Sequence, residues 1–201
     1  SNAYSNTGQL APVNTVITLA KELGIVSVLD IAQSAGVIPL DLQHTRPDFM
    51  LGSSVKWLCG GPGAAYLWVN PAIIEQCHPK DVGWFSHENP FEFDIHHFSY
   101  HQSAMKFWGG TPSIAPFALA GHAIDYFASL GSHQVRAHNQ QMIELLVNEF
   151  DAEVKSPLNT GTRSSTVILH FKDKQTKIIY ALPLANIGVD ARHLGMRVSP
   201  H

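Results

Sequence analysis

Apolar and polar residues alternate along the first part of this chain in a pattern that predicts a surface helix followed by a buried strand. Residues 12–23 carry apolar positions at helical spacing, with Pro12 at the start and Gly24 after the end. Residues 25–30, Ile-Val-Ser-Val-Leu-Asp, form a short β-branched run of the kind that is buried in a parallel sheet. Because this run ends on an aspartate, we expect a charged side chain at the end of the strand.

Two more strands are expected further along the chain. The residue types at 48–54 and 65–69 are typical of strands. A turn at residues 60–63, Gly-Gly-Pro-Gly, precedes the second of these strands. The turn lacks the Lys-Ser or Lys-Thr ending of a nucleotide phosphate loop, so we interpret it as a tight backbone turn. The order helix, strand, turn, strand, turn, strand is typical of part of an α/β layered domain.

The pattern changes after residue 79. Residues 79–107 are irregular, aromatic and rich in histidine, and an irregular segment of this length is typical of a functional site. Residues 113–150 return to helical spacing, with a break at Gly131. We therefore place a domain boundary there, with residues 4–130 in a first domain and residues 131–201 in a second.

The second domain combines short strands with one apolar helical segment. We expect strands around Val154 and at residues 167–169 and 196–198. The apolar segment at residues 178–184 contains Pro183, which ends or kinks a helix. This pattern predicts a small α+β domain.

Composition and charge narrow the classes of function. The 201 residues are 45% hydrophobic and carry a formal net charge of −3, which leaves no basic surplus for nucleic acid or an anionic membrane. No apolar run has the length of a membrane span and the start has no signal-peptide pattern, so we expect a soluble, cytoplasmic protein. The two cysteines are too few for a disulfide framework or a thiolate metal cage.

Asp30 and Lys56 are the residues with the clearest chemical potential. Ligands of α/β sheets bind beyond the carboxyl ends of strands, where Asp30 lies, although an aspartate there also commonly caps the following turn. Lys56 lies between Val55 and Trp57, and apolar surroundings favour the neutral amine, a nucleophile for carbonyls. Pyridoxal phosphate (PLP) needs both groups, a lysine for a Schiff base and an aspartate that keeps the pyridine nitrogen protonated.

Six motifs run through nearly the whole chain. They occupy residues 30–36, 52–63, 83–87, 107–112, 188–192 and 197–200. In this order and spacing they resemble PLP enzymes of fold type I, in the class V aminotransferase family, and among these the kynureninases. The resemblance implies an α/β fold: part of the large PLP-binding domain, with a mainly parallel sheet, and a small C-terminal α+β domain.

The resemblance assigns four residues to the cofactor. It implies that Lys56 holds PLP covalently and moves protons at the substrate α-carbon, and that Asp30 pairs with the pyridine nitrogen. Gln33 occupies a position near the phenolic oxygen of the cofactor, where an amide can donate a hydrogen bond. Ser53, three residues before the lysine, matches a serine that binds phosphate in related desulfurases.

The resemblance assigns two further residues to the cofactor of a second subunit and one to the substrate. Trp84 and Thr111 match positions that reach the cofactor phosphate of the other subunit in kynureninase-like dimers. Arg197 matches the arginine that binds the substrate α-carboxylate, a task that suits its bidentate fork. The resemblance therefore implies a homodimer with shared active sites and an amino acid as the small-molecule substrate.

The chain departs from the family pattern at three points. Val55 stands where kynureninases have a tyrosine and desulfurases a histidine, and valine can neither hydrogen-bond phosphate nor relay a proton. Thr111 replaces the asparagine of some kynureninases. No cysteine follows Cys77, whereas a desulfurase needs a thiol shortly before the carboxylate-binding arginine, and this favours a reaction without a protein persulfide.

We expect the twelve histidines to lie in loops and interfaces rather than to form a metal site. His96, His97 and His101 are close in sequence, but no carboxylate or cysteine ligand recurs nearby at helical spacing. We therefore expect no metal.

The two ends of the chain lead to an expectation about its completeness. Residues 1–3, Ser-Asn-Ala, are similar to the remnant of a removed tag, so we expect the native sequence to start at Tyr4. Nothing before Asp30 matches the helix N-terminus and small polar residues that hold the cofactor phosphate in fold type I enzymes. We expect a truncated chain, inactive by itself, from a longer enzyme.

For that longer enzyme the resemblance implies hydrolytic cleavage of a carbon–carbon bond in an amino acid, as in kynureninase. The alternatives are a cysteine desulfurase or selenocysteine lyase and a class V aminotransferase. A different class of function, a non-catalytic fragment that only forms a dimer interface through residues 79–112, also stays open.

Overall fold

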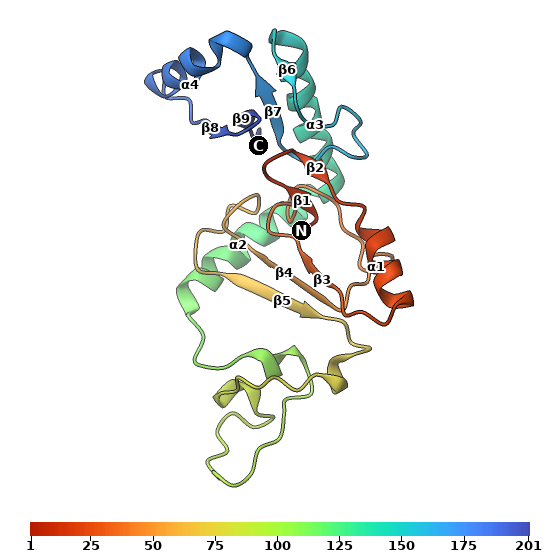
Figure 1. Ribbon diagram of the computed structural model, residues 1–201. Coiled ribbons are helices and arrows are strands. Elements are labelled where there is room, and N and C mark those ends of the chain that lie inside the picture. Colours follow the sequence, from red (N-terminus) through yellow and green to blue (C-terminus); the bar gives the residue numbers. More distant parts are fainter.

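Three strands form the sheet of the first domain, in the order β3-β4-β5 (Figure 1). They are β3 (Val28–Asp30), β4 (Phe49–Ser53) and β5 (Ala65–Val69). The computed structural model describes residues 1–201. β3 and β4 are parallel, whereas β4 and β5 are antiparallel, so this sheet is mixed. Residues 54–64 connect β4 to β5 without a helix, and so short a connection joins antiparallel neighbours.

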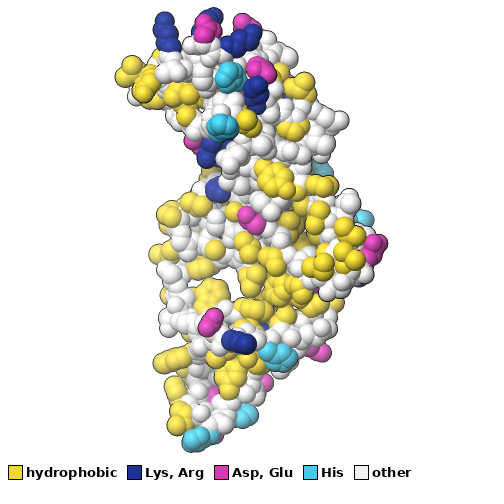
Figure 2. Space-filling model, in the orientation of Figure 1, with side chains coloured by type: hydrophobic (Ala, Val, Ile, Leu, Met, Phe, Trp, Pro, Cys, Tyr) yellow, Lys and Arg dark blue, Asp and Glu magenta, His cyan; other side chains and the backbone are white.

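One face of this sheet packs against the first helix, α1 (Val13–Glu22), which confirms the helix expected there. Leu29, Ile31 and Met50 form the buried cluster, and Val13 at the start of α1 packs against it. On the other face, Val28 is 60% exposed. Figure 2 shows hydrophobic side chains over the region of α1 and the sheet. This second face is covered only in part within the chain, because Phe107 packs against Phe49 at one end of it.

The N-terminal residues form a small hairpin of β1 (Ala3–Tyr4) and β2 (Gln9–Leu10). Asn2 and Ala3 are buried, and the Asn2 amide donates a hydrogen bond of 2.8 Å to the carbonyl oxygen of Asp30. The first three residues, expected to be a tag remnant, thus pack onto the end of β3, while their origin stays a prediction.

The irregular segment predicted at residues 79–107 contains only short turns of 3₁₀ helix in and around it. These are η1 (Ile74–Gln76), η2 (Trp84–Ser86) and η3 (Ala104–Phe107). The ammonium group of buried Lys106 donates hydrogen bonds to the carbonyl oxygens of Ile74, at 2.8 Å, and Cys77, at 3.3 Å. We call residues 79–107 the aromatic lobe; it projects away from the sheet at the bottom of Figure 1.

Two long helices lead from the aromatic lobe to the second domain. α2 (Ile114–Leu130) and α3 (Ser132–Glu149) are separated by Gly131, whose φ of 81° ends the first helix. The break at Gly131 is therefore confirmed, because this left-handed backbone favours glycine.

The second domain contains an antiparallel sheet in the order β6-β7-β9-β8, with α3 and α4 packed around it. Its elements are β6 (Glu153–Val154), β7 (Val167–His170), η4 (Lys172–Lys174), α4 (Gln175–Leu184), β8 (Asp190–Arg192) and β9 (Gly195–Val198). Ile143, Val167 and Leu169 form its buried core. α4 ends one residue after Pro183, as expected. The sequence did not predict β8, the edge strand.

The N-terminal hairpin also joins the two domains. The turn of the hairpin contacts residues 162–164: Ser164 donates a backbone hydrogen bond of 2.7 Å to Gly8, and Leu10 donates one of 2.8 Å to Thr162. These contacts hold the segment before β7 against the N-terminal hairpin.

Candidate active site

Asp30 is fixed at the end of β3 by one hydrogen bond to its side chain and one to its backbone. Its Oδ1 accepts a hydrogen bond of 2.8 Å from the amide of Ala32, and its carbonyl oxygen accepts the one from Asn2. The turn-capping role considered for Asp30 is therefore present. It leaves Oδ2 for other partners and fixes the direction of the carboxylate.

Lys56 lies in the turn that follows β4, and its side chain has no hydrogen-bond or ion-pair partner in the chain. It is exposed, whereas the neighbouring Trp57 is only 6% exposed. The apolar surroundings expected for Lys56 are thus absent, because the turn directs Trp57 inward and leaves the lysine open to solvent. The amine is free to react with a molecule that enters beside it.

Two adjoining cavities share Gln33 and Lys56. The first, which we call the Asp30 cavity, has a volume of about 510 Å³ and is lined by Asp30 and by the N-terminal hairpin. The second, which we call the Arg197 cavity, has a volume of about 240 Å³ and is lined by Arg197. Lys56 can therefore reach a molecule that contacts Asp30 on one side and Arg197 on the other.

The charge of Asp30 affects the pKa of a neighbouring tyrosine. Burial raises the pKa of Tyr66 on β5, and the negative charge of Asp30 raises this pKa further. Tyr66 is the cross-strand partner of Gly52, and a Cβ atom at Gly52 would lie 2.5 Å from the Tyr66 Oη. The missing side chain at Gly52 is what leaves room for the ring there.

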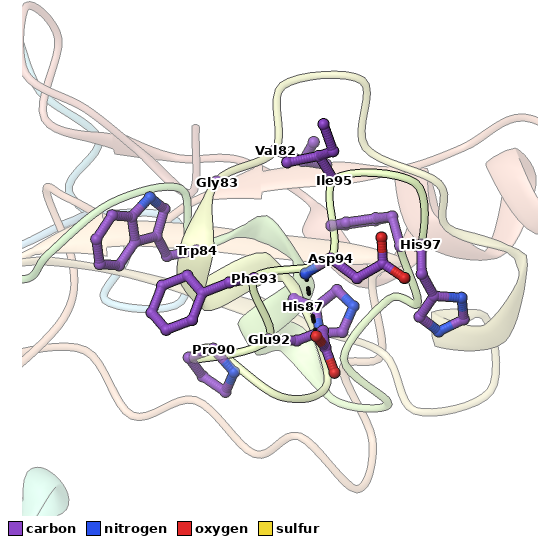
Figure 3. A pocket seen from close by; sticks show the side chains of 11 residues that line it. Val82, Gly83, Trp84, His87, Pro90, Glu92, Phe93, Asp94, Ile95 and His97 are labelled. Atoms are coloured by element: carbon purple, nitrogen blue, oxygen red, sulfur yellow. Dashed lines mark hydrogen bonds between the residues drawn. The ribbon is translucent and has the colours of Figure 1, made fainter.

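Of the other residues selected from the sequence, Ser53 is the last residue of β4 and lines neither cavity. Trp84 is 61% exposed and lines a separate cavity of about 360 Å³ in the aromatic lobe, where its ring meets Phe93 edge to face (Figure 3). Thr111 is exposed, just before α2. The roles of these three residues stay predictions, and within this chain Trp84 lies outside the Lys56 site.

The structure adds residues that the sequence reasoning missed. Ser199 and His201 line the Arg197 cavity, and His201 stacks on Trp57 with ring centroids 5.3 Å apart and hydrogen-bonds the Trp57 carbonyl oxygen at 2.9 Å. Polar residues of the first hairpin line the Asp30 cavity: Ser5, Asn6, Thr7 and Gln9. The small polar run before Gly8 was the available signal of a turn.

No group of three or more His, Cys, Asp or Glu side chains is arranged to hold a metal ion. None of the helices is both long and apolar enough to cross a membrane.

Comparison with known proteins identifies the family. Residues 1–199 match the family described as aminotransferase class V. A kynureninase from Deinococcus radiodurans is 30% identical over 169 residues, which are 80% of this chain and 41% of that protein. A probable cysteine desulfurase from Streptomyces coelicolor is 29% identical over 164 residues, 80% of this chain and 38% of that protein.

Solved structures share the fold. An apo cysteine desulfurase from Thermococcus onnurineus superimposes with a TM-score of 0.82 at 21% identity, over 100% of this chain and 53% of that one. A mutant of C-DES with glycine covalently linked to its PLP cofactor gives a TM-score of 0.82 at 18% identity, over 100% of this chain and 54% of the other. The chain thus spans about half or less of the length of the proteins it matches.

The α/β fold is that of fold type I PLP enzymes, which confirms the fold class expected from the sequence. The chain belongs to the class V aminotransferase family, whose members are PLP-dependent enzymes. The residues present fit this cofactor, since one cavity offers a carboxylate, an amide and an unpaired lysine amine. The family is common to several reactions, so it leaves the reaction open.

Proposed function

We propose that this chain forms the lysine-containing part of a PLP-dependent enzyme that acts on an amino acid, with kynureninase-like hydrolytic cleavage of a carbon–carbon bond as its reaction. The observation that carries the proposal is the position of Lys56, which lines both the Asp30 cavity and the Arg197 cavity. Kynureninases are among the relatives at 28–30% identity. We assign the activity to a longer polypeptide, in the cytoplasm, that contains these residues.

PLP, when bound, supplies an electron-withdrawing pyridine ring that stabilises negative charge on the substrate. In the proposed arrangement, the Asp30 carboxylate keeps the proton on the pyridine nitrogen, and Gln33 donates a hydrogen bond at the edge of the ring. The amine of Lys56 would hold the cofactor and would move the proton at the substrate α-carbon.

Arg197 completes the arrangement from the second domain. Its guanidinium lines the cavity that Lys56 also lines, and a guanidinium binds a carboxylate with two parallel hydrogen bonds. The substrate α-carboxylate at Arg197 would place the α-carbon toward Lys56. A water molecule would add to the side-chain carbonyl carbon, the bond from this carbon to the β-carbon would break, and the β-carbon would take up a proton. Val55 contributes no polar group to this chemistry.

Cysteine desulfurase is the second candidate reaction. A probable desulfurase is 29% identical to this chain, and the Sγ of Cys59 lies 3.8 Å from the Nε2 of His201, a residue that lines the Arg197 cavity. A thiol beside the site is what such a reaction requires. A selenocysteine lyase or an aminotransferase would use the same Asp30, Lys56 and Arg197.

The proposal includes a homodimer. The aromatic lobe exposes Trp84 at 61%, Phe93 at 73% and Ile95 at 89%, and an exposed apolar patch of this kind marks a protein interface. A second copy seated there would bring Trp84 and Thr111 to the active site of its partner.

The cofactor assignment is tested with PLP and a lysine variant. PLP added to the protein should give the visible absorbance band of lysine-bound cofactor, and Lys56→Ala should lose it. Lys177→Ala, at an exposed lysine on α4, serves as the matched control and should keep the band. A band that persists in Lys56→Ala would refute the role of this lysine.

The reaction is tested separately on the full-length protein. Release of alanine from kynurenine would support the hydrolytic reaction, and release of sulfide from cysteine would favour the desulfurase. Failure of both assays in a protein that shows the lysine-bound cofactor would reject both reactions and retain the enzyme class.

A further inference from the structure

Arg197 forms an ion pair with Asp190 on the hairpin of β8 and β9, and Asp190 also binds Arg192. Its Nη2 lies 2.7 Å from the Oδ2 of Asp190, and the same oxygen accepts a hydrogen bond of 2.6 Å from the Nη2 of Arg192. One carboxylate oxygen therefore bridges two guanidinium groups.

The strand register explains this arrangement. Asp190 and Arg197 are directly opposite each other in the antiparallel pair of β8 and β9. Asp190 and Arg192 are two residues apart on β8, so their side chains project from the same face. The two-residue turn at residues 193–194 holds this pairing in place.

Only one of the three charged side chains lines the Arg197 cavity. Arg197 does, together with Lys56, whereas neither Asp190 nor Arg192 lines it. Asp190 thus contacts the Arg197 guanidinium from outside the cavity, and Arg192 contacts Asp190 there.

The contacts leave part of the Arg197 guanidinium unused. Its ion pair with Asp190 involves Nη2, and neither Nη1 nor Nε has a side-chain partner in the chain. A guanidinium has five N–H donors in a planar fork, so one contact fixes its orientation and leaves donors for a second carboxylate.

Arg192 depends on Asp190 for its polar contact. Its hydrogen bond to Asp190 is the one side-chain contact it makes, and its Nε is buried without an acceptor. Two guanidinium groups and one carboxylate carry a net charge of +1, so the group still attracts an anion. Without Arg192, the ion pair of Asp190 and Arg197 alone would be neutral.

We propose that Asp190 and Arg192 are positioning residues that orient the Arg197 guanidinium toward the cavity and keep it positive, so that it binds the carboxylate of the substrate. This inference rests on the proposed function, in which Arg197 meets an amino acid. Asp190 sets the direction of the guanidinium, and Arg192 compensates the charge of Asp190.

The test uses propionate, a simple carboxylate that needs no cofactor, with propionamide as the uncharged comparison. Propionate should shift the NMR resonance of the Arg197 Nε–H group in the 201-residue protein, and propionamide should not. A protein in which propionate leaves this resonance unchanged would overturn the proposal.

Asp190→Ala separates positioning from competition, because the two predict opposite signs. If Asp190 orients Arg197, its loss weakens propionate binding about tenfold and speeds rotation of the guanidinium, as expected for loss of one well-oriented charge-assisted contact. If Asp190 only competes for Arg197, its loss tightens binding. Tighter or unchanged binding would overturn the proposal.

Arg192→Gln tests whether Arg192 acts through Asp190. This variant should weaken propionate binding in the otherwise unchanged protein and have no further effect beside Asp190→Ala, as coupled residues do in a double-mutant cycle. Equal effects in both backgrounds would refute the coupling. Arg192→Gln also tests the proposal alone if Asp190→Ala fails to fold.

Glu153→Gln is the matched control. It removes an ion pair with Lys155 at β6, the opposite edge of the same sheet, and should leave propionate binding unchanged. The readout at Arg197 needs no PLP. If the unsubstituted protein shows no PLP band but binds propionate as expected, the proposed function alone is rejected. If it shows the PLP band but propionate binding does not respond as expected, this inference alone is rejected.

Discussion

Asp30 interacts with three other residues, through its backbone, its side chain and its charge. Its backbone fixes Asn2, its Oδ1 caps the next turn, and its charge raises the pKa of Tyr66 across the sheet. The residue that would keep the cofactor protonated is thus held by contacts that exist without the cofactor. Such a carboxylate pays little reorganisation when a ligand enters.

Asp30→Asn should lower the pKa of Tyr66. The charge of Asp30 is the second cause of the raised pKa and burial is the first, so the pKa should fall but stay above the ordinary value of 10.0. Because the pKa is raised in the folded protein, Tyr66 contributes stability that is lost as the pH rises above 10.0. Tyrosinate absorbance in an alkaline titration, compared with Tyr66→Phe, measures the shift. An unchanged midpoint would show that the two groups do not interact.

Single residues differ in how far the sequence revealed them. Asp30 and Lys56 were found because each follows an apolar strand, and the structure brings both to one cavity. Their roles and those of Gln33 and Arg197 stay predictions. Trp57 and His201 were missed, because their contact joins positions 144 residues apart and leaves no local pattern.

At the scale of elements, the local sequence sets where helices and strands begin and end. The length of the connection between two strands sets whether they pair parallel or antiparallel. α1, β4, β5 and the break at Gly131 lie where hydrophobic spacing and glycine placed them. β8 was missed because a three-residue edge strand has no period to detect, and it is defined by its partner β9.

The turn of the N-terminal hairpin gives a prediction at this scale. Gly8 has a φ of 67°, and a Cβ there would lie 2.5 Å from the carbonyl oxygen of Thr166 in the second domain. Gly24 has a φ of 66° and open space around it. Both changes to alanine add backbone strain of about 1 kcal/mol. Gly8→Ala also forces the two domains apart, so it should cost about 1–3 kcal/mol more than Gly24→Ala.

Urea unfolding of the two variants measures this difference in the free energy of unfolding. Gly24→Ala is the control, because it reproduces the strain without the collision. Equal losses in the two variants would mean that the hairpin does not hold the domains together.

At the scale of the whole molecule, the distribution of exposed apolar surface is the observation that supports the proposed homodimer. The aromatic lobe and the open face of the β3-β4-β5 sheet expose large hydrophobic side chains, whereas the core clusters are small. Soluble monomers rarely leave large contiguous apolar patches uncovered.

The role of the aromatic lobe as the dimer interface is tested by introducing a charge there. Phe93→Glu and Ile95→Glu should each convert a dimer into a monomer in sedimentation experiments, because burial of an unpaired carboxylate at an interface is unfavourable. Leu158→Glu, at a side chain 66% exposed in the second domain, is the control and should leave the dimer intact. A dimer that survives both lobe variants would place the interface elsewhere.

The sequence by itself determined most of the helices and strands, the break at Gly131 and the family, because helices, strands and glycine turns arise from neighbours along the chain and because the motifs keep their order. Only the tertiary structure decided that β5 returns antiparallel, that Lys56 is exposed between two cavities, and that Asp190 bridges Arg192 and Arg197. Each of these depends on strand pairing and side-chain packing in three dimensions, which the hydrophobic pattern of a single segment does not specify. The position of Lys56 between the two cavities also depends on the N-terminal hairpin and on Arg197, which lie far from it in the sequence.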